Sequence, residues 1–401
     1  MRLLILSFYY RPDLSAGSFR ATALVEALQA RAPAGTRIDV LTTLPNRYST
    51  FTQDAAEVEP LASGEIRRIP LPAHRSDIRG QSRAFLHFAR EVSAHVRDRH
   101  YDLVFATSSR LMTAALGARI AQRMRARLYL DIRDIFVDTI TEILSGPASL
   151  AARLLFSPIE SWTLRRADRV NLVSPGFAPY FRERYGDRDF AAFTNGIDAE
   201  FLAAAPAIVT RASQTGATGA SQPGIATILY AGNIGEGQGL HEILPPLAAA
   251  LRGRARFIVI GDGGRRELLQ SEIARSGVDS VELRPPVPRT ELIAAYHAAD
   301  VLLLHLGRHA AFEKVLPSKL FEYAALGKPL LAGVAGYAAR FVREEITNAA
   351  VFTPCDAAAA VTAFESLRLE DRPRPEFVAR FLRSNIAAAM ADDVLAVAAR
   401  A

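Results

Sequence analysis

Short apolar runs alternate with stretches of helical periodicity through most of this 401-residue chain. The run Leu3–Tyr9 is apolar almost throughout, as expected of a strand covered on both faces. A helix at Phe19–Arg31 follows it, and the segment IDVLTT is then typical of a second strand. Because strands joined by helices form open sheets with helices on both faces, the alternation predicts an α/β fold of doubly wound parallel sheets.

Residues 203–224 interrupt this alternation. They are almost entirely Ala, Ser, Thr, Gly, Gln and Pro, carry one charge and show no periodicity, which is typical of a flexible linker. We therefore expect two Rossmann-like domains, at residues 1–202 and 225–375, joined by a linker at 203–224. The helical tail at 376–401 is expected to pack back on the first domain.

Charge and cysteine content narrow the classes of partner. The net charge is +6, and residues 1–200 hold 27 Arg against 22 acids, which suits a nucleic acid, an anionic membrane or a phosphorylated substrate. The chain lacks interleaved aromatic and basic residues on a sheet, so we expect no nucleic-acid partner. Cys355 stands alone, which excludes an internal disulfide, and no run of 18 apolar residues occurs. A cytoplasmic protein is the expectation.

All three lysines lie in the stretch Phe312–Leu331, whereas the other 45 of the 48 basic residues are Arg. This stretch predicts a helix from Ser318 to about Leu326, with Ser318 as its N-cap and Gly327 as its stop. Lys is a compact, flexible point charge that suits contact with phosphate. Chance clustering of three lysines is the alternative.

Three strand-to-helix turns in the second half are candidates for binding an anion. They are the glycine-rich turns at 232–239 and 261–264 and the Pro-Ser-Lys turn at 317–319. Glycines let the backbone approach an anion closely, and helix N-termini offer unpaired N–H groups. Each turn alone is often only structural, but together on one sheet edge they favour a phosphorylated nucleotide.

Lys319 and Glu322 lie three residues apart, on one face of the expected helix. Lys319 and the amides of Ser318–Leu320 could bind a diphosphate, and the Glu322 carboxylate could accept hydrogen bonds from the two hydroxyls of a ribose. A surface ion pair worth about 0.2–0.5 kcal/mol is the alternative. Spacing alone does not decide between them.

Eight segments, in order and spacing, resemble the retaining glycosyltransferases of family 4, which have the GT-B fold. They are YYRPDLSAGSFR, VLTTLPNRY, DIRDIFVDTITEI, ADRVNLVSPGF, FTNGID, LYAGNIGEGQGL, FIVIGDGG and PSKLFEYAALGKPLL. The chain is similar to the branch, including WbuB-type transferases, that assembles bacterial O-antigen, capsule and exopolysaccharide.

This resemblance implies two Rossmann-like domains facing across a cleft and transfer of a sugar with retention. The implied donor is a nucleotide-diphosphate sugar, UDP-linked and carrying a hexosamine. The implied acceptor is a saccharide or a polyprenyl-diphosphate-linked sugar, and no metal or other cofactor is implied.

The resemblance also assigns donor residues. Glu322 matches the second of the family's two glutamates, which contacts ribose, while Lys314 occupies the place of the first and Glu313 is its neighbour. Asn233 and Gln238 stand where the family has Arg and Lys, so Lys319 is expected to replace those cations. The remaining matches are Gly17 in the loop that faces the donor diphosphate, Gly232 in the first turn of the second domain, and Arg284 beside the base.

Acidic residues of the first half are candidates for the acceptor side. Asp131, Arg133 and Asp134 end a predicted strand, where a carboxylate could take a proton from the acceptor or bind it. An Arg133–Asp134 pair that stabilises a loop is the alternative, and Asp138 and Glu142 are further candidates. The expected catalytic set is Lys319, Asp134 and Glu313.

A basic segment of the first half could contact an anionic membrane at the inner face of the plasma membrane, as a lipid-linked acceptor would require. A helix whose apolar face is ordinary core is the alternative. The segment contains Phe85, Leu86 and Phe88 among the arginines Arg75, Arg79, Arg83, Arg90, Arg97 and Arg99.

Two other functions share the expected architecture. A nucleotide-sugar 2-epimerase would need acids and histidines around the sugar, and His305 and His309 are the evident pair. A non-catalytic nucleotide-sugar-binding protein stays open because the first glutamate is absent.

Overall fold

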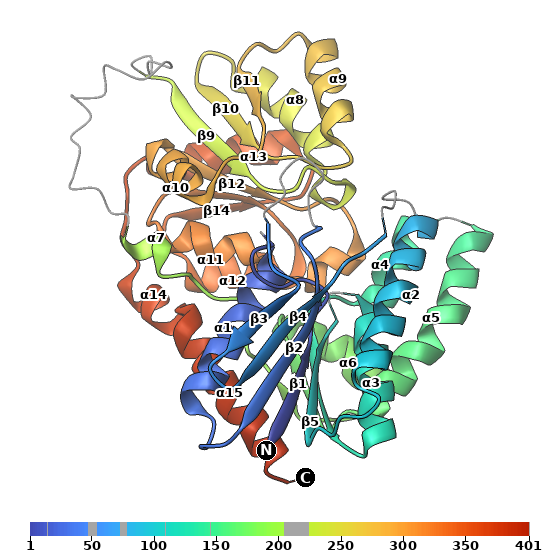
Figure 1. Ribbon diagram of the computed structural model, residues 1–401. Helices are drawn as coiled ribbons and strands as arrows, with labels where there is room; N and C mark the ends of the chain where they lie inside the picture. The colour runs from blue at the N-terminus through green and yellow to red at the C-terminus, as the bar shows by residue number, and fades with distance from the viewer. Residues whose placement is uncertain are drawn as a thin grey trace. The chain divides into compact units, whose positions relative to one another are not determined.

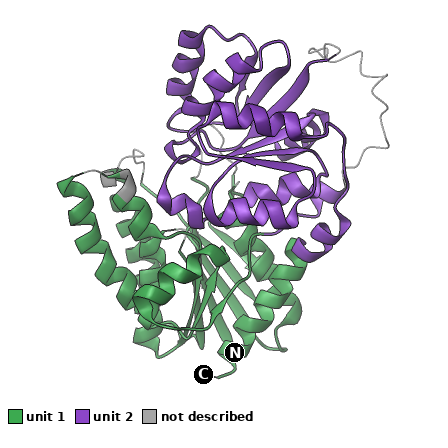
Figure 2. Cartoon of the chain, turned by 180° about the vertical axis from the view of Figure 1, so that it is seen from behind, with its two compact units in different colours: residues 1–195, 383–401 green, residues 196–382 purple. Residues whose placement is uncertain are grey.

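Two β-sheets carry the fold, one in each of two units of the chain (Figures 1 and 2). The computed structural model describes residues 1–13, 15–46, 54–72, 78–108, 110–144, 146–203 and 224–400. Unit 1 comprises Met1–Asn195 and Arg383–Ala401, and unit 2 comprises Gly196–Leu382. The expected class, α/β with parallel sheets in two Rossmann-like domains, is confirmed.

The sheet of unit 1 has eight strands in the order β3-β4-β2-β1-β5-β6-β7-β8. All neighbours are parallel except β3 and β4, a pair at the edge. Four of the five residues of β1 are buried, as its apolar sequence predicts. The strands are β1 (Arg2–Leu6), β2 (Arg37–Thr43), β3 (Val58–Leu61), β4 (Gly64–Ile69), β5 (Leu103–Thr107), β6 (Arg127–Ile132), β7 (Arg169–Leu172) and β8 (Phe190–Ala191).

Helices cover both faces of this sheet (Figure 1). The last helix of the chain packs beside the first, because Met390, Ala391 and Val394 share a core with Leu24 and Val25. The helices are α1 (Ala16–Arg31), α2 (Ile78–His95), α3 (Leu111–Met124), α4 (Phe136–Ile143), α5 (Pro147–Arg165), the 3-10 turn η1 (Pro175–Phe177), α6 (Ala178–Tyr185) and α15 (Arg383–Ala398).

The sheet of unit 2 is parallel throughout, in the order β11-β10-β9-β12-β13-β14. The chain runs outward from β9 on one side and then returns to β12 on its other side. In open α/β sheets, such a switch point marks where ligands bind, at the carboxyl ends of the strands. The strands are β9 (Ala226–Ala231), β10 (Ala255–Ile260), β11 (Val281–Arg284), β12 (Val301–His305), β13 (Leu330–Gly333) and β14 (Ala349–Phe352).

The helices of unit 2 include two 3-10 turns, η2 and η3, that follow strands directly. None of the helices in the described parts of either unit is long and apolar enough to span a bilayer. The elements are α7 (Glu200–Ala203), η2 (Glu236–Gln238), α8 (Leu240–Ala250), α9 (Arg266–Ser276), α10 (Arg289–Ala298), η3 (Ala310–Lys314), α11 (Ser318–Ala325), α12 (Gly336–Glu345), α13 (Ala357–Ser366) and α14 (Pro375–Phe381).

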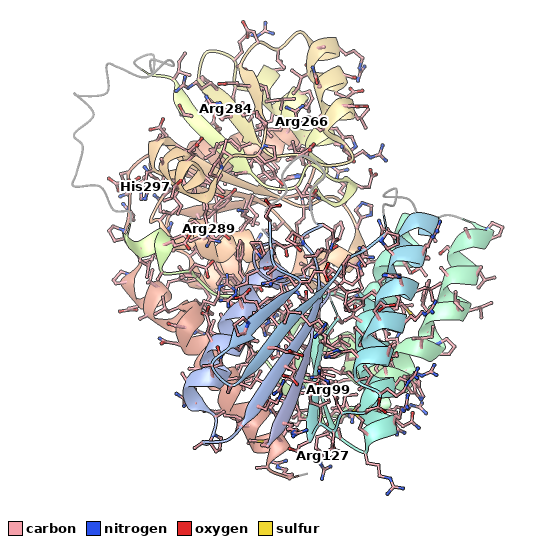
Figure 3. All side chains as sticks on the ribbon, in the orientation of Figure 1. Arg99, Arg127, Arg266, Arg284, Arg289 and His297 are labelled. Carbon is pink, nitrogen blue, oxygen red and sulfur yellow. The ribbon has the colours of Figure 1, made fainter. Side chains whose placement is uncertain are left out.

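The boundary after Asn195 differs from the expected one after residue 202 because the next segment is fixed to unit 2. Arg289, at the start of α10 (Figure 3), pairs with Asp198 and, at 2.6 Å, with Glu200. Its guanidinium also lies 4.9 Å from the ring centre of Phe201. Of the expected linker, residues 204–223 lie outside the described residues.

The second boundary falls after Leu382, so the tail that joins unit 1 begins later than residue 376. The reason is an aromatic cluster: Phe377 and Phe381 of α14 pack on Phe321 and Phe341 of unit 2, with ring centres 5.2 to 6.2 Å apart. Only α15 packs on the first unit.

Candidate functional site

The first turn of unit 2, residues 232–239, lies at the switch point and packs directly against the turn after β10. The N–H groups of Gly232 and Ile234 donate to the carbonyls of Ile260 and Asp262. A Cβ on Gly261, whose φ is +156°, would lie 1.9 Å from the carbonyl oxygen of Gly232, so only glycine fits there. The glycines therefore bring the backbones of two loops together beside the carboxyl ends of β9 and β10.

Helix α11 follows β12, on the other side of the switch point. The prediction that Ser318 is its N-cap was wrong: Pro317 is the capping residue and Ser318 is the first helical residue. No side chain caps this end, but the N–H of Leu320 already donates to the carbonyl of Pro317 at 3.1 Å. The N–H groups of Ser318 and Lys319 thus stand at the positive end of the helix dipole.

Lys319 lies against the first turn, with its Cε 3.9 Å from the position that a Cβ on Gly232 would occupy. Its Nζ donates to Glu322 Oε2 and to the Tyr296 hydroxyl, each at 2.9 Å. Burial alone would lower the pKa of Lys319, but the Glu322 carboxylate outweighs it and the pKa lies above its ordinary value. Lys319 therefore carries a fixed positive charge at the switch point.

The ion pair proposed as an alternative for Lys319 and Glu322 does form, but it is not a surface pair. Only 6% of Glu322 is exposed. Burying a charged carboxylate without a partner would destabilise the fold. The ammonium group of Lys319 offsets this cost for Glu322.

Sequence reasoning missed two tyrosines that complete this cluster. Tyr296 of α10 accepts from Lys319, and its ring packs edge-on against Tyr323 of α11, with ring centres 5.2 Å apart. The Tyr323 hydroxyl accepts from the N–H of Ala231, at the end of β9, at 3.1 Å. Burial raises the pKa of both tyrosines, so both hydroxyls stay protonated. No local pattern indicated this role, because the contacts join elements far apart in the sequence.

Asn233 and Gln238, which stand in place of the family's cations, bond to each other across the turn. Asn233 Nδ2 donates to Gln238 Oε1 at 2.8 Å, and the N–H of Gly235 donates to the same oxygen at 3.2 Å. The carbonyl of Gln238 is held in turn by His305 Nδ1 at 2.6 Å. The turn is therefore shaped by amides rather than by charges.

His305 is a structural residue. It is 1% exposed, its Nδ1 donates to Gln238, and its Nε2 accepts from the N–H of Cys355 at 2.9 Å. Burial lowers its pKa to about 4, so it is neutral. With both ring nitrogens committed to the backbone, it cannot serve the epimerase chemistry for which His305 and His309 were the expected pair.

Two other expected donor residues lie on other elements of unit 2, β11 and η3. Arg284 ends β11, the edge strand (Figure 3), and its guanidinium forms a two-point pair with Glu282 at 2.7 and 2.9 Å. Glu313 is exposed on η3, where its backbone meets Gly336 at the start of α12. Among the described residues, no group of three or more His, Cys, Asp or Glu is placed to hold a metal ion.

Asp131 of unit 1 was expected on the acceptor side, but it is a buried structural carboxylate. Arg20 of α1 binds both of its oxygens, at 2.8 and 2.9 Å, and Asn171 donates to it at 2.7 Å. Burial alone would raise its pKa, but the Arg20 guanidinium holds the pKa below its ordinary value. A charged carboxylate with all these partners is not free to take a proton.

Arg133 lies beside the start of α1, with Asp131 and Asp134 as charged neighbours. Its Nη1 is buried without a hydrogen-bond partner, and its guanidinium carbon lies 3.8 Å from the position of a Cβ on Gly17. Burial lowers its pKa to about 10, so it stays protonated at neutral pH. Its Nη1 therefore has a hydrogen bond to offer, which an anion could accept.

Asp134 lines a small pocket of unit 1 together with Ser108, Phe136, Glu160 and Phe181. Glu160, which sequence reasoning missed, is 4% exposed and accepts from the hydroxyls of two tyrosines, Tyr180 at 3.0 Å and Tyr185 at 2.6 Å. Burial raises the pKa of Glu160, and the hydrogen bonds from the two tyrosines partly oppose that shift.

The other acidic candidates of this half lie on α4. Asp138 is 3.5 Å from Arg184, and the side chain of Glu142 lies outside the described residues.

The basic helix expected to face a membrane, α2, uses most of its apolar side chains in the core. Phe85 and Phe88 are 7% and 0% exposed and pack on Phe8. Of the three apolar residues named for this surface, only Leu86 is exposed. Arg75 and the side chain of Arg79 lie outside the described residues.

Two family models match the chain, one in each half. The model described as "Glycosyl transferase 4-like domain" matches residues 17–196, and the model described as "Glycosyl transferases group 1" matches residues 219–381. The first match ends at residue 196, next to the boundary between the units after Asn195.

Known proteins resemble the chain over most of its length. A 2-deoxystreptamine glucosyltransferase of Streptomyces kanamyceticus is 28% identical over 284 residues, which are 68% of this chain and 70% of that protein. The structure of WaaG, a glycosyltransferase involved in lipopolysaccharide biosynthesis, covers 100% of this chain and 98% of its own at 15% identity, with a TM-score of 0.66. Anabaena HepE in complex with UDP and glucose has the same coverage at 16% identity, with a TM-score of 0.56.

Proposed function

The chain belongs to the glycosyltransferases that combine a 4-like domain with a group 1 domain, and on this premise we propose that it transfers a sugar with retention of anomeric configuration. The donor is a nucleotide-diphosphate sugar, UDP-linked and carrying a hexosamine. The acceptor is a saccharide or a polyprenyl-diphosphate-linked sugar of a bacterial surface polysaccharide.

The observation that carries this proposal is the cluster of Lys319, Glu322 and Tyr296 against Gly232. It places a fixed cation, an uncapped helix start and a glycine turn together at the switch point of unit 2. Those three features together suit a diphosphate. The HepE complex supports UDP as the nucleotide, since that protein shares the fold.

In the proposed reaction, an acceptor hydroxyl oxygen bonds to the anomeric carbon of the donor while the bond from that carbon to the diphosphate oxygen breaks. The departing diphosphate gains negative charge, and Lys319 and the N–H groups at the start of α11 stabilise it. Glu322 accepts from the ribose hydroxyls, with Ser318, Leu320, Gly232 and Asn233 around the nucleotide. Glu313 stands in for the family's first glutamate, and Arg284 borders the base. The residues assigned to these roles require no metal.

On the acceptor side, Asp134 receives the acceptor hydroxyl and takes its proton. The pocket that it lines with Glu160 supports this role. Arg133, beside Gly17, has a buried Nη1 without a hydrogen-bond partner, which could donate to a phosphate such as that of a polyprenyl-diphosphate carrier. Asp138 remains a candidate for contacting the acceptor sugar.

The place of action that fits these substrates is the cytoplasmic side of the plasma membrane. Nucleotide sugars and lipid-linked acceptors meet at that surface. The similarity to WaaG, which is involved in lipopolysaccharide biosynthesis, supports a role in surface-polysaccharide assembly.

A screen of sugars linked to UDP, GDP, dTDP and ADP tests this function. Thermal shift and calorimetry should detect binding of a UDP-linked sugar, and NMR of the product formed on a lipid-linked or saccharide acceptor should show the anomeric configuration of the donor. Binding of no nucleotide sugar would refute the proposal, and an inverted product would refute retention. Binding without transfer to any acceptor would favour the non-catalytic alternative.

A further inference from the structure

Exposed leucines gather on one helix of unit 1. Leu150, Leu154 and Leu155 of α5 are 60%, 68% and 59% exposed, and Trp162 of the same helix is 38% exposed. Single exposed apolar residues are ordinary on a protein surface, but a contiguous set marks a site of interaction. With the exposed Pro158, these residues form what we call the α5 stripe.

Helix geometry confines the stripe to one face. Residues 150, 154, 158 and 162 recur every four positions, so they lie along one side of α5. The opposite side carries Ala152, Glu160, Thr163 and Leu164, all buried. That side attaches α5 to unit 1, where it packs on α3 and α4. The residues of the α5 stripe therefore do not contribute to the hydrophobic core of unit 1.

The exposed charges on α5 and at its C-cap are all positive. Arg153, Arg165 and Arg166 are exposed, and the one acidic residue of the helix is Glu160, which is buried beneath the hydroxyls of Tyr180 and Tyr185. An apolar strip with cations beside it and no exposed acid on the same helix is complementary to a surface that is apolar and anionic. Two such faces from two copies of the chain would repel each other.

We propose that α5 docks on an anionic lipid bilayer, lying in the plane of its surface with the α5 stripe at the boundary between headgroups and acyl chains. The arginines contact lipid phosphates, and Trp162 sits at the interface, where indole rings are favoured. This surface differs from the one expected on α2. The inference deepens the proposed membrane location but depends on neither the donor sugar nor the acceptor.

Trp162 is the only tryptophan of the chain, so its fluorescence reports on this face alone. Vesicles of phosphatidylglycerol and phosphatidylcholine should move its emission to shorter wavelength, and lipids brominated on the acyl chains should quench it. Pure phosphatidylcholine vesicles and high salt should weaken both effects, because the cations lose their partners. No change with anionic vesicles would overturn the proposal.

A double variant separates docking from folding. Leu154→Asn with Leu155→Asn should reduce partition onto anionic vesicles about tenfold or more, since it removes apolar area from the bilayer contact. Leu369→Asn, at an exposed leucine of unit 2, is the matched control and should partition like the wild type. Circular dichroism and thermal unfolding of each variant check that it is folded.

Two outcomes would contradict the proposal outright. One is equal partition of the double variant and the wild type. The other is a shift in Trp162 emission that grows with protein concentration without lipid, which would assign the stripe to a second copy of the chain. UDP binding measured on the same samples distinguishes this failure from that of the proposed function: loss of vesicle binding alone leaves the transferase assignment intact.

Discussion

Lys319 is held by two residues from different elements, Glu322 of its own helix and Tyr296 of α10. These contacts hold the side chain of Lys319 beside Gly232. A charge that is already in position needs no reorganisation when a diphosphate departs, which is the main way in which a protein stabilises such a transition state. At the scale of single residues, the structure thus shows how Lys319 is held in one position, which the sequence of the Pro-Ser-Lys turn does not reveal.

His305 gives the clearest dependence on pH. Its pKa is about 4 in the folded protein because of burial, against an ordinary value of 6.5. Between these values the unfolded chain takes up a proton that the folded protein does not, so stability is complete above pH 6.5 and falls as the pH drops toward 4. The shift corresponds to about 3 kcal/mol.

Urea unfolding between pH 4.5 and 7.5 measures this effect. His305→Asn should be less stable than the wild type at pH 7.5 but should lose less stability on acidification. His309→Asn, whose native ring packs edge-on against Phe312, is the control and should follow the wild type. Parallel pH curves for the wild type and His305→Asn would show that the assignment is wrong.

At the scale of elements, the pair of Arg20 and Asp131 joins α1 to β6 inside unit 1. Both side chains are buried, at 6% and 1% exposure, and Asn171 of β7 completes the network. Arg20→Met should cost about 3–5 kcal/mol of the free energy of unfolding, because it leaves Asp131 buried without its cation. Arg20→Met with Asp131→Leu should recover much of that loss.

Chemical unfolding checks this prediction, with Arg254→Met as the control. Arg254 pairs with Glu365 on the surface of unit 2, where such pairs contribute about 0–1 kcal/mol. If Arg20→Met costs no more than Arg254→Met, the buried pair does not stabilise the junction of α1 and β6.

The same elements show which structural features could be predicted from the sequence and which could not. Apolar runs and helical periodicity located most strands and helices, because burial on both faces leaves a pattern that can be read locally. The role of Asp131 was not readable, since Arg20 lies 111 positions away. Tyr296 and Glu160 were missed for the same reason: their partners come from other elements. Ser318 was assigned as the N-cap from residue preference, but the backbone of Pro317 occupies that position.

At the scale of the whole chain, the presence of two units with separate sheets was predicted correctly. The two positions where the chain passes from one unit to the other, after Asn195 and after Leu382, were not. Asp198 and Glu200 are fixed by Arg289, and Phe377 and Phe381 by an aromatic cluster of unit 2. Each fixes its segment to unit 2 through a contact with residues far away in the sequence. The composition of 203–224 predicts a linker but carries no information about which unit its flanking residues join.

The central claim is that α11 binds the nucleotide of a sugar donor through Lys319 and Glu322. Calorimetric titration with UDP, uridine and 2′-deoxy-UDP tests it most directly, because uridine lacks the diphosphate proposed for Lys319 and 2′-deoxy-UDP lacks a ribose hydroxyl proposed for Glu322. Lys319→Met should weaken UDP about tenfold or more while leaving uridine unchanged. Glu322→Gln should reduce the preference for UDP over 2′-deoxy-UDP.

Lys328→Met is the matched control in that titration, since Lys328 pairs with Asp371 at 3.0 Å and has no part in the proposed site. The account predicts that this variant binds all three ligands as the wild type does. Tight UDP binding that neither Lys319→Met nor Glu322→Gln alters would contradict the assignment of the site.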